Sequence, residues 1–297
     1  MSKKASYLLT TALVVGFLGI PRAHALDLLA YFDFNDDSDP AAALEVSGNA
    51  PDAILNGPAF IGADAGGVTG SAGDRALDLG AIGNGASAIV PAGTHFDAAF
   101  TNNSMSVSWW QNLSGTGNAS SFWIHSPAAG GNDRGFQGHV PWGNGTVYFD
   151  QSGCCGGPQR LTVGGVIIQN QWQHFVLQRD ADGNREIWVD GVLVANAAGA
   201  EPLDAFNGLM TIGAEGNNNN NSMAGLLDDI AVFDSALDPD QIASLADGSL
   251  NPGTLITPPA DEDGDGLPDA YEQTIIDADP ADDVDGLDDV SDTSDFD

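Results

Sequence analysis

Short runs of alternating apolar and polar residues, separated by turn residues, fill the chain between Leu26 and Leu250. Alternation of this kind places every second side chain on one face of a strand. Many short strands at this spacing indicate an all-β sandwich or barrel. The predicted strands cover residues 28–34, 75–79, 104–111, 122–125, 135–140, 146–150, 172–179, 185–189, 192–195, 209–212 and 230–233.

Local signals mark a hairpin and one helix in this region. Asp190-Gly191 lies between two predicted strands, and both residue types tolerate the positive φ of a type I′ turn. A helix signal runs from Asp238 to Gly248, with an N-cap aspartate, proline at the first helical position and glutamine in a capping box. We expect this one short helix to flank an edge of the β domain.

Residues 1–25 have the features of a secretory signal peptide. Two lysines precede an apolar run, and Ala23-His24-Ala25 matches the small-x-small pattern of a signal peptidase site. The apolar run is shorter than the roughly 20 residues that a membrane-spanning helix needs, so we expect no direct membrane insertion. The mature protein would begin at Leu26 and be secreted, displayed on the cell surface or periplasmic.

The charge balance excludes two classes of partner. The chain has 8 Lys and Arg against 42 Asp and Glu, a formal net charge of −34. Because such a surface repels phosphate groups, we expect neither nucleic acid nor anionic lipid as a partner. Calcium and neutral sugars remain compatible with it.

Many of the acidic residues lie in a C-terminal tail. A linker rich in Pro and Gly over residues 251–260 precedes it, and residues 261–297 contain no Lys or Arg. The tail begins with the pattern D-x-D-x-D-G-x5-E, in which oxygen ligands wrap Ca²⁺ around a glycine turn. The predicted ligands are Asp261, Asp263, Asp265, Asp269, Glu272 and the carbonyl of Leu267.

A weaker second copy of the loop contains Asp283, Asp285 and Asp289 but departs from the pattern at its first and last positions. A third copy opens at Asp295, so we expect the chain to be the N-terminal part of a longer modular protein with further domains. The segments DEDGDGLPDAYE and DDVDGLDDVSD resemble thrombospondin type 3 repeats. This resemblance implies a calcium-stiffened connector between extracellular domains.

The β region resembles a laminin G-like, concanavalin A-like domain of the bacterial secreted type. The resemblance is carried, in the family's order, by LLAYFDFND, RALDLG, NSMSVSWWQN, QNQWQHFVLQRDADGNREIWVDGVLVAN, GLMTIGAEG and AGLLDDIAVFDSALDPDQI. It implies a two-sheet antiparallel jelly-roll sandwich over residues 26–250. It does not fix the activity, because lectins, adhesion modules, glucanases and lyases share this fold.

The sequence offers little of what catalysis on this fold requires. Retaining glycoside hydrolysis needs two carboxylates about 5–5.5 Å apart, and no strand has a Glu-x-Asp-x-x-Glu pattern. The lyases of this fold resemble a different pattern, a Gln-x-His strand with a basic strand, of which Trp123-Ile124-His125 offers only the His. We therefore predict that the chain is not an enzyme.

A glycine-rich segment from Arg134 to Arg160 is the candidate ligand site. Sugar sites combine an aromatic face with a few polar groups that fix hydroxyls, and this segment has both. Trp142, between Pro and Gly, either is exposed for such a contact or folds back onto the core. The candidate residues are His139, Trp142, Asp150, Cys154, Cys155 and Arg160.

Cys154 and Cys155 are the only cysteines of the chain. Neighbouring Cα atoms lie about 3.8 Å apart, closer than the span of about 4.4–6.8 Å in ordinary disulfides. The glycines on both sides can accommodate the tight ring of a vicinal disulfide, which is our prediction. Free thiols and intermolecular bridges are the alternatives.

Other side chains have two interpretations each. We expect three of the four tryptophans at positions 109, 110, 172 and 188 to lie in the core, and His174 to be a hydrogen-bonded strand histidine. Asp33 or Asn35 would lie near Asp228 and Asp229 if the first and last strands pair. These acids form either a second metal site or turn caps, and we prefer the caps.

Together these patterns predict a secreted, non-catalytic binding or adhesion module whose cofactor is calcium and whose partner is a glycan or another extracellular surface. One alternative is a structural spacer of a large surface protein, whose sandwich binds nothing specific. Another is the targeting module of a polysaccharide-degrading enzyme.

Neutralising two carboxylates of the predicted loop, by Asp263→Asn with Asp265→Asn, should weaken calcium binding. Because a carboxylate is the ligand at each position, we expect at least a tenfold increase from a dissociation constant of about 10⁻⁴–10⁻³ M. Calorimetric titration of the mature chain measures this. The control, Asp182→Asn with Asp240→Asn, removes two acids of the β region; equal binding by both variants would contradict the loop assignment.

Overall fold

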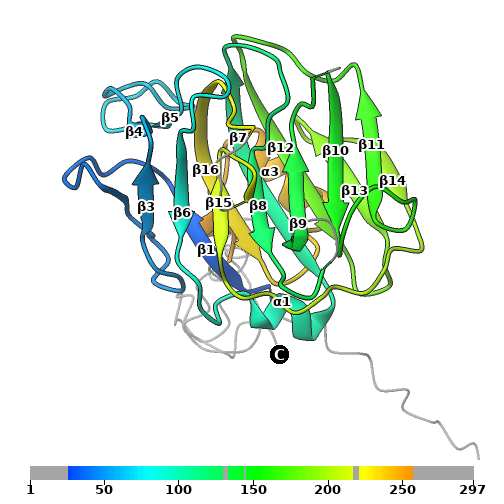
Figure 1. The fold of residues 1–297 in the computed structure, drawn as a ribbon. Helices are drawn as coiled ribbons and strands as arrows, with labels where there is room; N and C mark the ends of the chain where they lie inside the picture. Colours follow the sequence, from blue (N-terminus) through cyan, green and yellow to red (C-terminus); the bar gives the residue numbers. More distant parts are fainter. Residues whose placement is uncertain (1–25, 130–132, 144, 217–220, 257–297) are drawn as a thin grey trace, which may run out of the picture.

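The computed structural model describes residues 26–129, 133–143, 145–216 and 221–256. These residues form two antiparallel β-sheets that pack face to face around an apolar core (Figure 1). The predicted all-β, two-sheet jelly-roll sandwich is confirmed. No helix in the described part of the chain is long and apolar enough to cross a bilayer.

Sheet A is the rear sheet in Figure 1. It consists of β1 (Leu28–Phe32), β4 (Phe60–Ile61), β5 (Leu77–Asp78), β7 (Met105–Leu113), β12 (Trp172–Arg179), β13 (Arg185–Val189), β14 (Val192–Ala197) and β16 (Gly225–Phe233). The strand order is β14-β13-β12-β7-β16-β5-β4, and β1 also pairs with β16.

Sheet B is the front sheet. It consists of β2 (Ala42–Ala43), β3 (Ala53–Asn56), β6 (Ser87–Val90), β8 (Phe122–His125), β9 (Arg134–His139), β10 (Thr146–Gln151), β11 (Arg160–Gly164) and β15 (Met210–Ile212). The strand order is β11-β10-β9-β8-β15-β6-β3-β2.

Alternation along the strands separates the core from the two outer faces. Trp109 of β7 points inward, and its ring centroid lies 5.2 Å from that of Phe122 in sheet B and 5.5 Å from that of Phe175 in sheet A. All three side chains are fully buried. The alternation therefore decides which side chains face the core and which face outward, although nearly all residues of strands such as β12 are buried on both faces.

The strand β16 connects the two ends of the domain. It pairs with β7 along one edge, while β5 and β1 share its other edge. The register breaks between Asp228 and Ala231, where the partner changes, and Asp229 has a left-handed φ of 48° there. The first and last strands thus pair, as expected.

The aspartates near this junction bind backbone amides. Asp228 accepts hydrogen bonds from the amides of Val68 at 3.0 Å and Asp229 at 2.9 Å, and Asp33 accepts one from the amide of Asn35 at 3.1 Å. The preferred interpretation as turn caps therefore holds for Asp33. Asp228 instead binds a loop 160 residues away, and Asp229 accepts a hydrogen bond from the hydroxyl of Tyr31.

The predicted helix is α3 (Pro239–Ala246). Asp238 and Gln241 form the capping box, and Gly248, at a φ of 74°, follows the last turn. Ile242 and Leu245 bury the apolar side of α3 against the outer face of sheet A. The expectation that this helix flanks an edge is therefore wrong, because it packs on the face of sheet A.

Two short helices were not predicted. One is α1 (Asp97–Asn102), between β6 and β7; the other is α4 (Pro252–Leu255), in the segment assigned to the linker. Asn251 caps α4, and Pro252 is buried. The packed domain therefore extends beyond Leu250.

Predicted and observed strand bounds coincide for β8, β12 and β13, whereas β16 begins earlier than predicted and β2, β3, β4, β6 and β11 were missed. The missed β2 and β4 have two residues each, too few for a period to be visible. The Asp190-Gly191 turn is confirmed, because Val189 pairs with Val192 and the two turn residues have φ of 49° and 76°.

Replacing Trp109 by alanine should lower the free energy of unfolding by about 3–5 kcal/mol, because it leaves a cavity between the sheets. Urea unfolding followed by circular dichroism measures the change. Leu193→Ala, at an exposed position of β14, is the control and should cost less than about 1 kcal/mol. Equal losses for the two variants would contradict the central place of Trp109 in the core.

Candidate functional site

Five strands of sheet B align polar and aromatic side chains in one row. The register pairs Thr211 with Trp123, Trp123 with Gln137, Gln137 with Asp150, and Asp150 with Arg160. Directly paired residues point to the same face of a sheet. Because the adjacent row lies in the hydrophobic core, this row points outward. We call Trp123, Gln137, Asp150 and Arg160 the cross-strand row.

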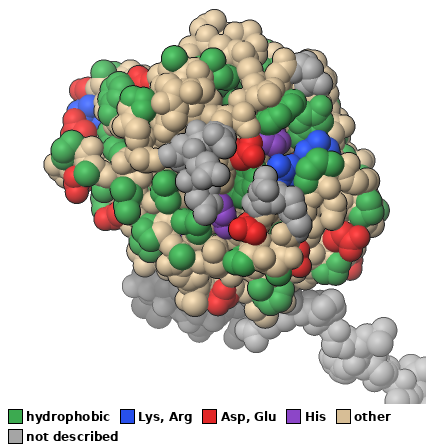
Figure 2. Space-filling model, viewed as in Figure 1, with side chains coloured by type: hydrophobic (Ala, Val, Ile, Leu, Met, Phe, Trp, Pro, Cys, Tyr) green, Lys and Arg blue, Asp and Glu red, His purple; other side chains and the backbone are tan. Residues whose placement is uncertain are grey.

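Figure 2 views this outward face of sheet B. Basic, acidic and histidine side chains come to the surface together near the middle of the face. The grouping is unusual in this chain, which has only 8 Lys and Arg. The face therefore differs in charge from the acidic remainder of the protein.

Asp150 is the centre of charge on this face. Its buried carboxylate accepts hydrogen bonds from Nη1 of Arg134 at 2.6 Å and from Nε and Nη2 of Arg160 at 2.5 Å each. The hydrogen bond to Asp150 also raises the pKa of Arg160. Burial of a carboxylate is costly unless it is paired. The two arginines compensate this cost and leave the trio with one net positive charge.

Both arginines also stack on aromatic rings. The guanidinium carbon of Arg134 lies 4.8 Å from the ring centroid of Trp123, and that of Arg160 lies 4.5 Å from the ring centroid of Tyr148. These cation–π contacts fix the planes of both guanidinium groups. The polar groups of the face are therefore already oriented in the absence of a ligand.

His139 belongs to a second cluster on the same face. Oγ of Ser120 lies 2.9 Å from its Nδ1 and the Gln137 amide nitrogen 2.9 Å from its Nε2, and the Trp142 ring packs on it at a centroid distance of 4.3 Å. Burial, and then the charge of Arg134, lower the pKa of His139 from 6.5 to about 3. The imidazole is thus neutral at neutral pH.

Three buried polar atoms of this region have no hydrogen-bond partner among the described residues: Nε2 of His125, Nε of Arg134 and Oε1 of Gln137. Buried polar groups nearly always have a partner. These atoms are therefore positions at which water or a ligand group would bind. Burial also lowers the pKa of His125 to about 4, so this ring too is neutral at neutral pH.

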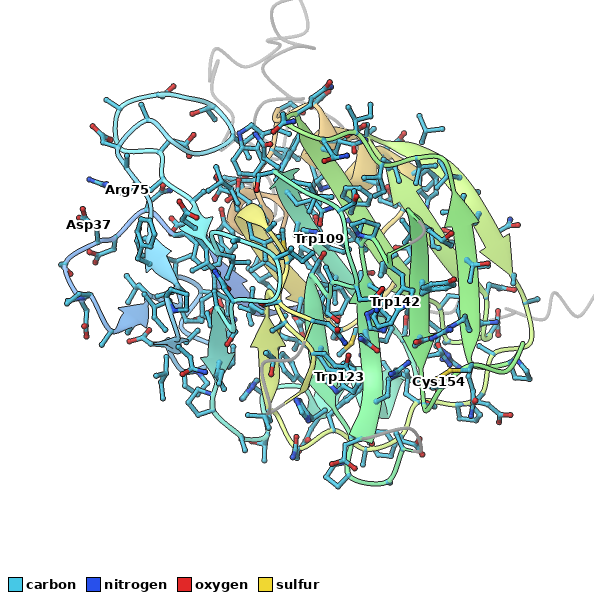
Figure 3. All side chains as sticks on the ribbon, turned by 45° about the horizontal axis from the view of Figure 1, so that its top comes forward. Asp37, Arg75, Trp109, Trp123, Trp142 and Cys154 are labelled. Atoms are coloured by element: carbon cyan, nitrogen blue, oxygen red, sulfur yellow. A yellow bond between two sulfur atoms is a disulfide. The ribbon has the colours of Figure 1, made fainter. Side chains whose placement is uncertain are left out.

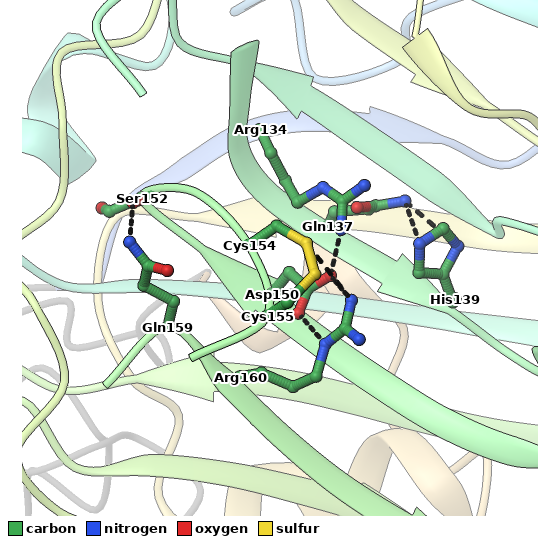
Figure 4. Close-up of a disulfide and its surroundings, with 9 residues drawn as sticks. All are labelled: Arg134, Gln137, His139, Asp150, Ser152, Cys154, Cys155, Gln159 and Arg160. Atoms are coloured by element: carbon green, nitrogen blue, oxygen red, sulfur yellow. Dashed lines mark hydrogen bonds and ion pairs between the residues drawn. A yellow bond between two sulfur atoms is a disulfide. The ribbon is translucent and has the colours of Figure 1, made fainter. Parts of the chain in front are cut away.

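The two cysteines lie at the edge of the face, in the loop between β10 and β11 (Figure 4). Cys154 is half-buried and Cys155 is exposed, and their sulfur atoms adjoin as in a vicinal disulfide. Nη2 of Arg160 lies 3.8 Å from Sγ of Cys154. The cysteine loop therefore contacts the end of the cross-strand row.

The structure brings the predicted ligand-site residues to one side of the sandwich. His139, Asp150 and Arg160 lie on adjacent strands, and Trp142 and Cys154 lie in loops beside them (Figure 3). Trp142 is half-buried against His139. Its position is thus intermediate between the two alternatives, exposed for a ligand or folded onto the core.

Trp123, Arg134, Gln137 and Tyr148 complete the face and were not predicted. Strand register brings them there, and register could not be read from the sequence. One sequence signal could have indicated part of this face. Gln137-Gly138-His139 has the Gln-x-His spacing of lyases with this fold, which the segment at His125 lacks. In this structure His139 is 2% exposed and its ring packs against that of Trp142.

The predicted calcium ligands lie outside the described residues. These are Asp261, Asp263, Asp265, Leu267, Asp269 and Glu272 of the first loop, and Asp283, Asp285 and Asp289 of the second. Residues 1–25, the predicted signal peptide, lie outside them as well.

Comparison with known families and structures identifies the fold. Residues 83–243, more than half of the chain, match the family described as the concanavalin A-like lectin/glucanases superfamily. No curated protein matches the chain.

Two solved structures have a similar fold. Domain 4 of AbnA, a GH43 extracellular arabinanase from Geobacillus stearothermophilus, in complex with arabinotriose, is 19% identical over 75% of this chain and 100% of that domain, with a TM-score of 0.54. The binding domain of botulinum neurotoxin DC in complex with rat synaptotagmin II is 15% identical over 75% of this chain, with a TM-score of 0.54. The match covers 52% of that neurotoxin domain. At these identities the likeness concerns the fold alone.

His139 should make the folded state less stable in acid. Its pKa is about 3 when folded and near 6.5 when unfolded, so the unfolded chain gains a proton first as the pH falls through this window. Between pH 7 and pH 4 the wild-type chain should therefore lose about 2–3 kcal/mol more stability than His139→Gln. Urea unfolding at both pH values measures the difference.

The comparison between pH values cancels any cost of the His139→Gln substitution that does not depend on pH. Equal acid sensitivity of the two chains would show that His139 titrates normally in the folded state. That result would contradict its burial between Ser120, Gln137 and Trp142.

Proposed function

Because the chain belongs to the concanavalin A-like lectin/glucanases superfamily, we propose that it is a secreted, non-catalytic module that binds a glycan of an extracellular surface. The binding site is the outward face of sheet B. The side chains around the cross-strand row carry this proposal, because the half-buried Trp142 and Arg160 lie beside polar groups that are held in fixed orientations. Sugar sites are built from an aromatic surface and fixed polar groups.

A sugar ring presents an apolar face of C–H groups and a rim of hydroxyls. The half-buried ring of Trp142 offers a surface for the apolar face. The side chain of Arg160 is 22% exposed and can donate hydrogen bonds to hydroxyls. Since Asp150 is already engaged by two arginines, a ligand would meet this carboxylate only through them.

The relatives support a binding role for this fold. The arabinanase domain was solved with arabinotriose and the neurotoxin domain with synaptotagmin II. The arabinanase domain, covered over its whole length, was thus solved with a glycan, whereas only 52% of the neurotoxin domain corresponds to this chain. The aromatic and polar character of the sheet B face favours the glycan here.

The tail and the cysteines have supporting roles in this proposal. Residues 261–297 would bind calcium and act as a stiffened connector, on the strength of the D-x-D-x-D-G-x5-E pattern. In an oxidising extracellular compartment Cys154 and Cys155 would form the vicinal disulfide. That ring would hold the loop that contacts Arg160.

Trp142→Ala should weaken glycan binding about five- to tenfold, because it removes the aromatic surface without changing the cross-strand row. A glycan-array screen of the secreted chain selects the ligand, and calorimetry then compares the variants. Trp172→Ala is the matched control, because Trp172 is also half-buried but lies on sheet A. Its affinity should equal that of the wild type.

Other outcomes would favour the alternatives. No selective binding on the array would favour a structural spacer, and equal loss in both tryptophan variants would place the site elsewhere. Release of shortened products with unsaturated sugars from a polysaccharide would contradict the non-catalytic role. It would also give Gln137 and His139 the lyase function that their spacing resembles.

A further inference from the structure

A cavity lies on the outer face of sheet A, on the opposite side of the sandwich from the cross-strand row. Its volume is about 380 Å³. Its floor is formed by Ser108, Trp110 and His174 of β7 and β12. Its walls are the end of β1, the loop at residues 68–74, the register break of β16 and the segment from the end of α3 to α4. None of the described residues that line it is Lys or Arg.

Three carboxylates line this cavity, those of Asp33, Asp74 and Asp229. Each already accepts a hydrogen bond on one oxygen, as Asp229 does from the hydroxyl of Tyr31 at 2.5 Å. A carboxylate can accept about four hydrogen bonds, so each retains free acceptor sites. Burial raises the pKa of Asp229 to about 6, with further contributions from the charges of Asp33 and Asp74. The three charges therefore repel one another across the cavity.

His174 is a second and independent sign of a ligand. It is 1% exposed and lines the cavity. Its Nε2 bonds to Oγ of Ser108 at 2.8 Å, whereas its Nδ1 has no partner among the described residues. The sequence predicted a hydrogen-bonded strand histidine, which holds for only one of the two nitrogens. An unpartnered polar atom at this depth indicates a missing hydrogen-bonding group.

Trp110 supplies an aromatic surface. Its ring lies 5.1 Å from that of His174 and lines the same cavity. Three of the four strand tryptophans were expected in the core, but only Trp109 and Trp188 are buried, and Trp110 and Trp172 are half-buried. An indole face attracts a cation by its quadrupole.

The arrangement suits an organic cation better than a metal ion. In the described part of the chain no three His, Cys, Asp or Glu residues converge closely enough to hold a metal. The carboxylates instead surround a space of about 380 Å³, far larger than a bare ion. A ligand with a primary ammonium group can donate to one of these carboxylates directly and to the others through water, so the carboxylates need not converge on one point.

We propose that this cavity binds a primary ammonium group, attracted by the carboxylates of Asp33, Asp74 and Asp229 and placed over the face of Trp110. The rest of the ligand extends toward His174, whose Nδ1 exchanges a hydrogen bond with it. The same chemistry is present in an amino sugar and in a lysine side chain. The site is independent of the proposed glycan site, because it lies on the other sheet.

The test follows Trp110 itself. In the mature chain labelled with 5-fluorotryptophan, Trp110→Phe identifies the fluorine resonance of Trp110 among those of the six tryptophans. The probes are glucosamine and Nα-acetyl-lysine amide, beside N-acetylglucosamine and Nα,Nε-diacetyl-lysine amide, neither of which carries an ammonium group. Both amines should shift the Trp110 resonance saturably, and the two compounds without an ammonium group should not. The amine that binds with the lower dissociation constant shows whether the ammonium group belongs to an amino sugar or to a lysine side chain.

Asp74→Asn and Asp229→Asn should each weaken amine binding about tenfold, because a charged hydrogen bond is lost. Asparagine tolerates the left-handed φ of residue 229, so the second variant keeps the local backbone. Asp182→Asn, an exposed acid outside the cavity, is the matched control and should bind like the wild type. Unaltered binding by both cavity variants would overturn the proposal.

Three further results would also overturn it. The first is no saturable shift of Trp110, and the second is an equal shift by the compounds without an ammonium group. The third is loss of the amine shift at calcium concentrations too low to act by screening, which would reassign the cavity to a metal ion. None of these results bears on glycan binding at sheet B, so failure of one proposal leaves the other standing.

Discussion

The pairing of β16 with three other strands is the constraint on which much of the molecule depends. One edge of β16 is occupied by β7, and the other is divided between β5 and β1. Two strands can share one edge only if the ladder is interrupted between them. The interruption falls at Asp228 and Asp229, which turns these carboxylates outward and lets Asp228 fix the loop at Val68. The cavity on sheet A is thus a consequence of the topology.

The two sheets bury their apolar faces against each other, so the polar chemistry is left to the outer faces. On sheet B the neighbours of Asp150 are arginines, and the cluster carries a positive charge. On sheet A the neighbours of Asp229 are further carboxylates, and the cavity is negative. Because the core separates the two faces, the two charge distributions are independent of each other. One fold therefore supplies two environments of opposite sign.

Much of the fold could be predicted from the sequence. Strands such as β12 and β13 have a clear period of two in their apolar residues, and Asp190-Gly191 has the residue types of a hairpin turn. The site was predicted only in part. His139, Trp142, Asp150 and Arg160 are close together in the chain, and composition was enough to group them. Trp123 reaches the same face through its pairing with Gln137, and register depends on the whole sheet. The cavity on sheet A joins residues from 31 to 254, which no local pattern connects.

The placement of the arginines makes the charged groups of the two faces differ. After residue 25 the chain has five arginines and no lysine, and two of these arginines bind the same carboxylate at the centre of the sheet B face. A single carboxylate cannot neutralise both, so this trio retains one positive charge on a face that also bears acidic side chains. A cationic group is repelled by the trio, whereas the carboxylates of the sheet A cavity attract it. From the net charge of the chain alone, both faces would be predicted to attract cations.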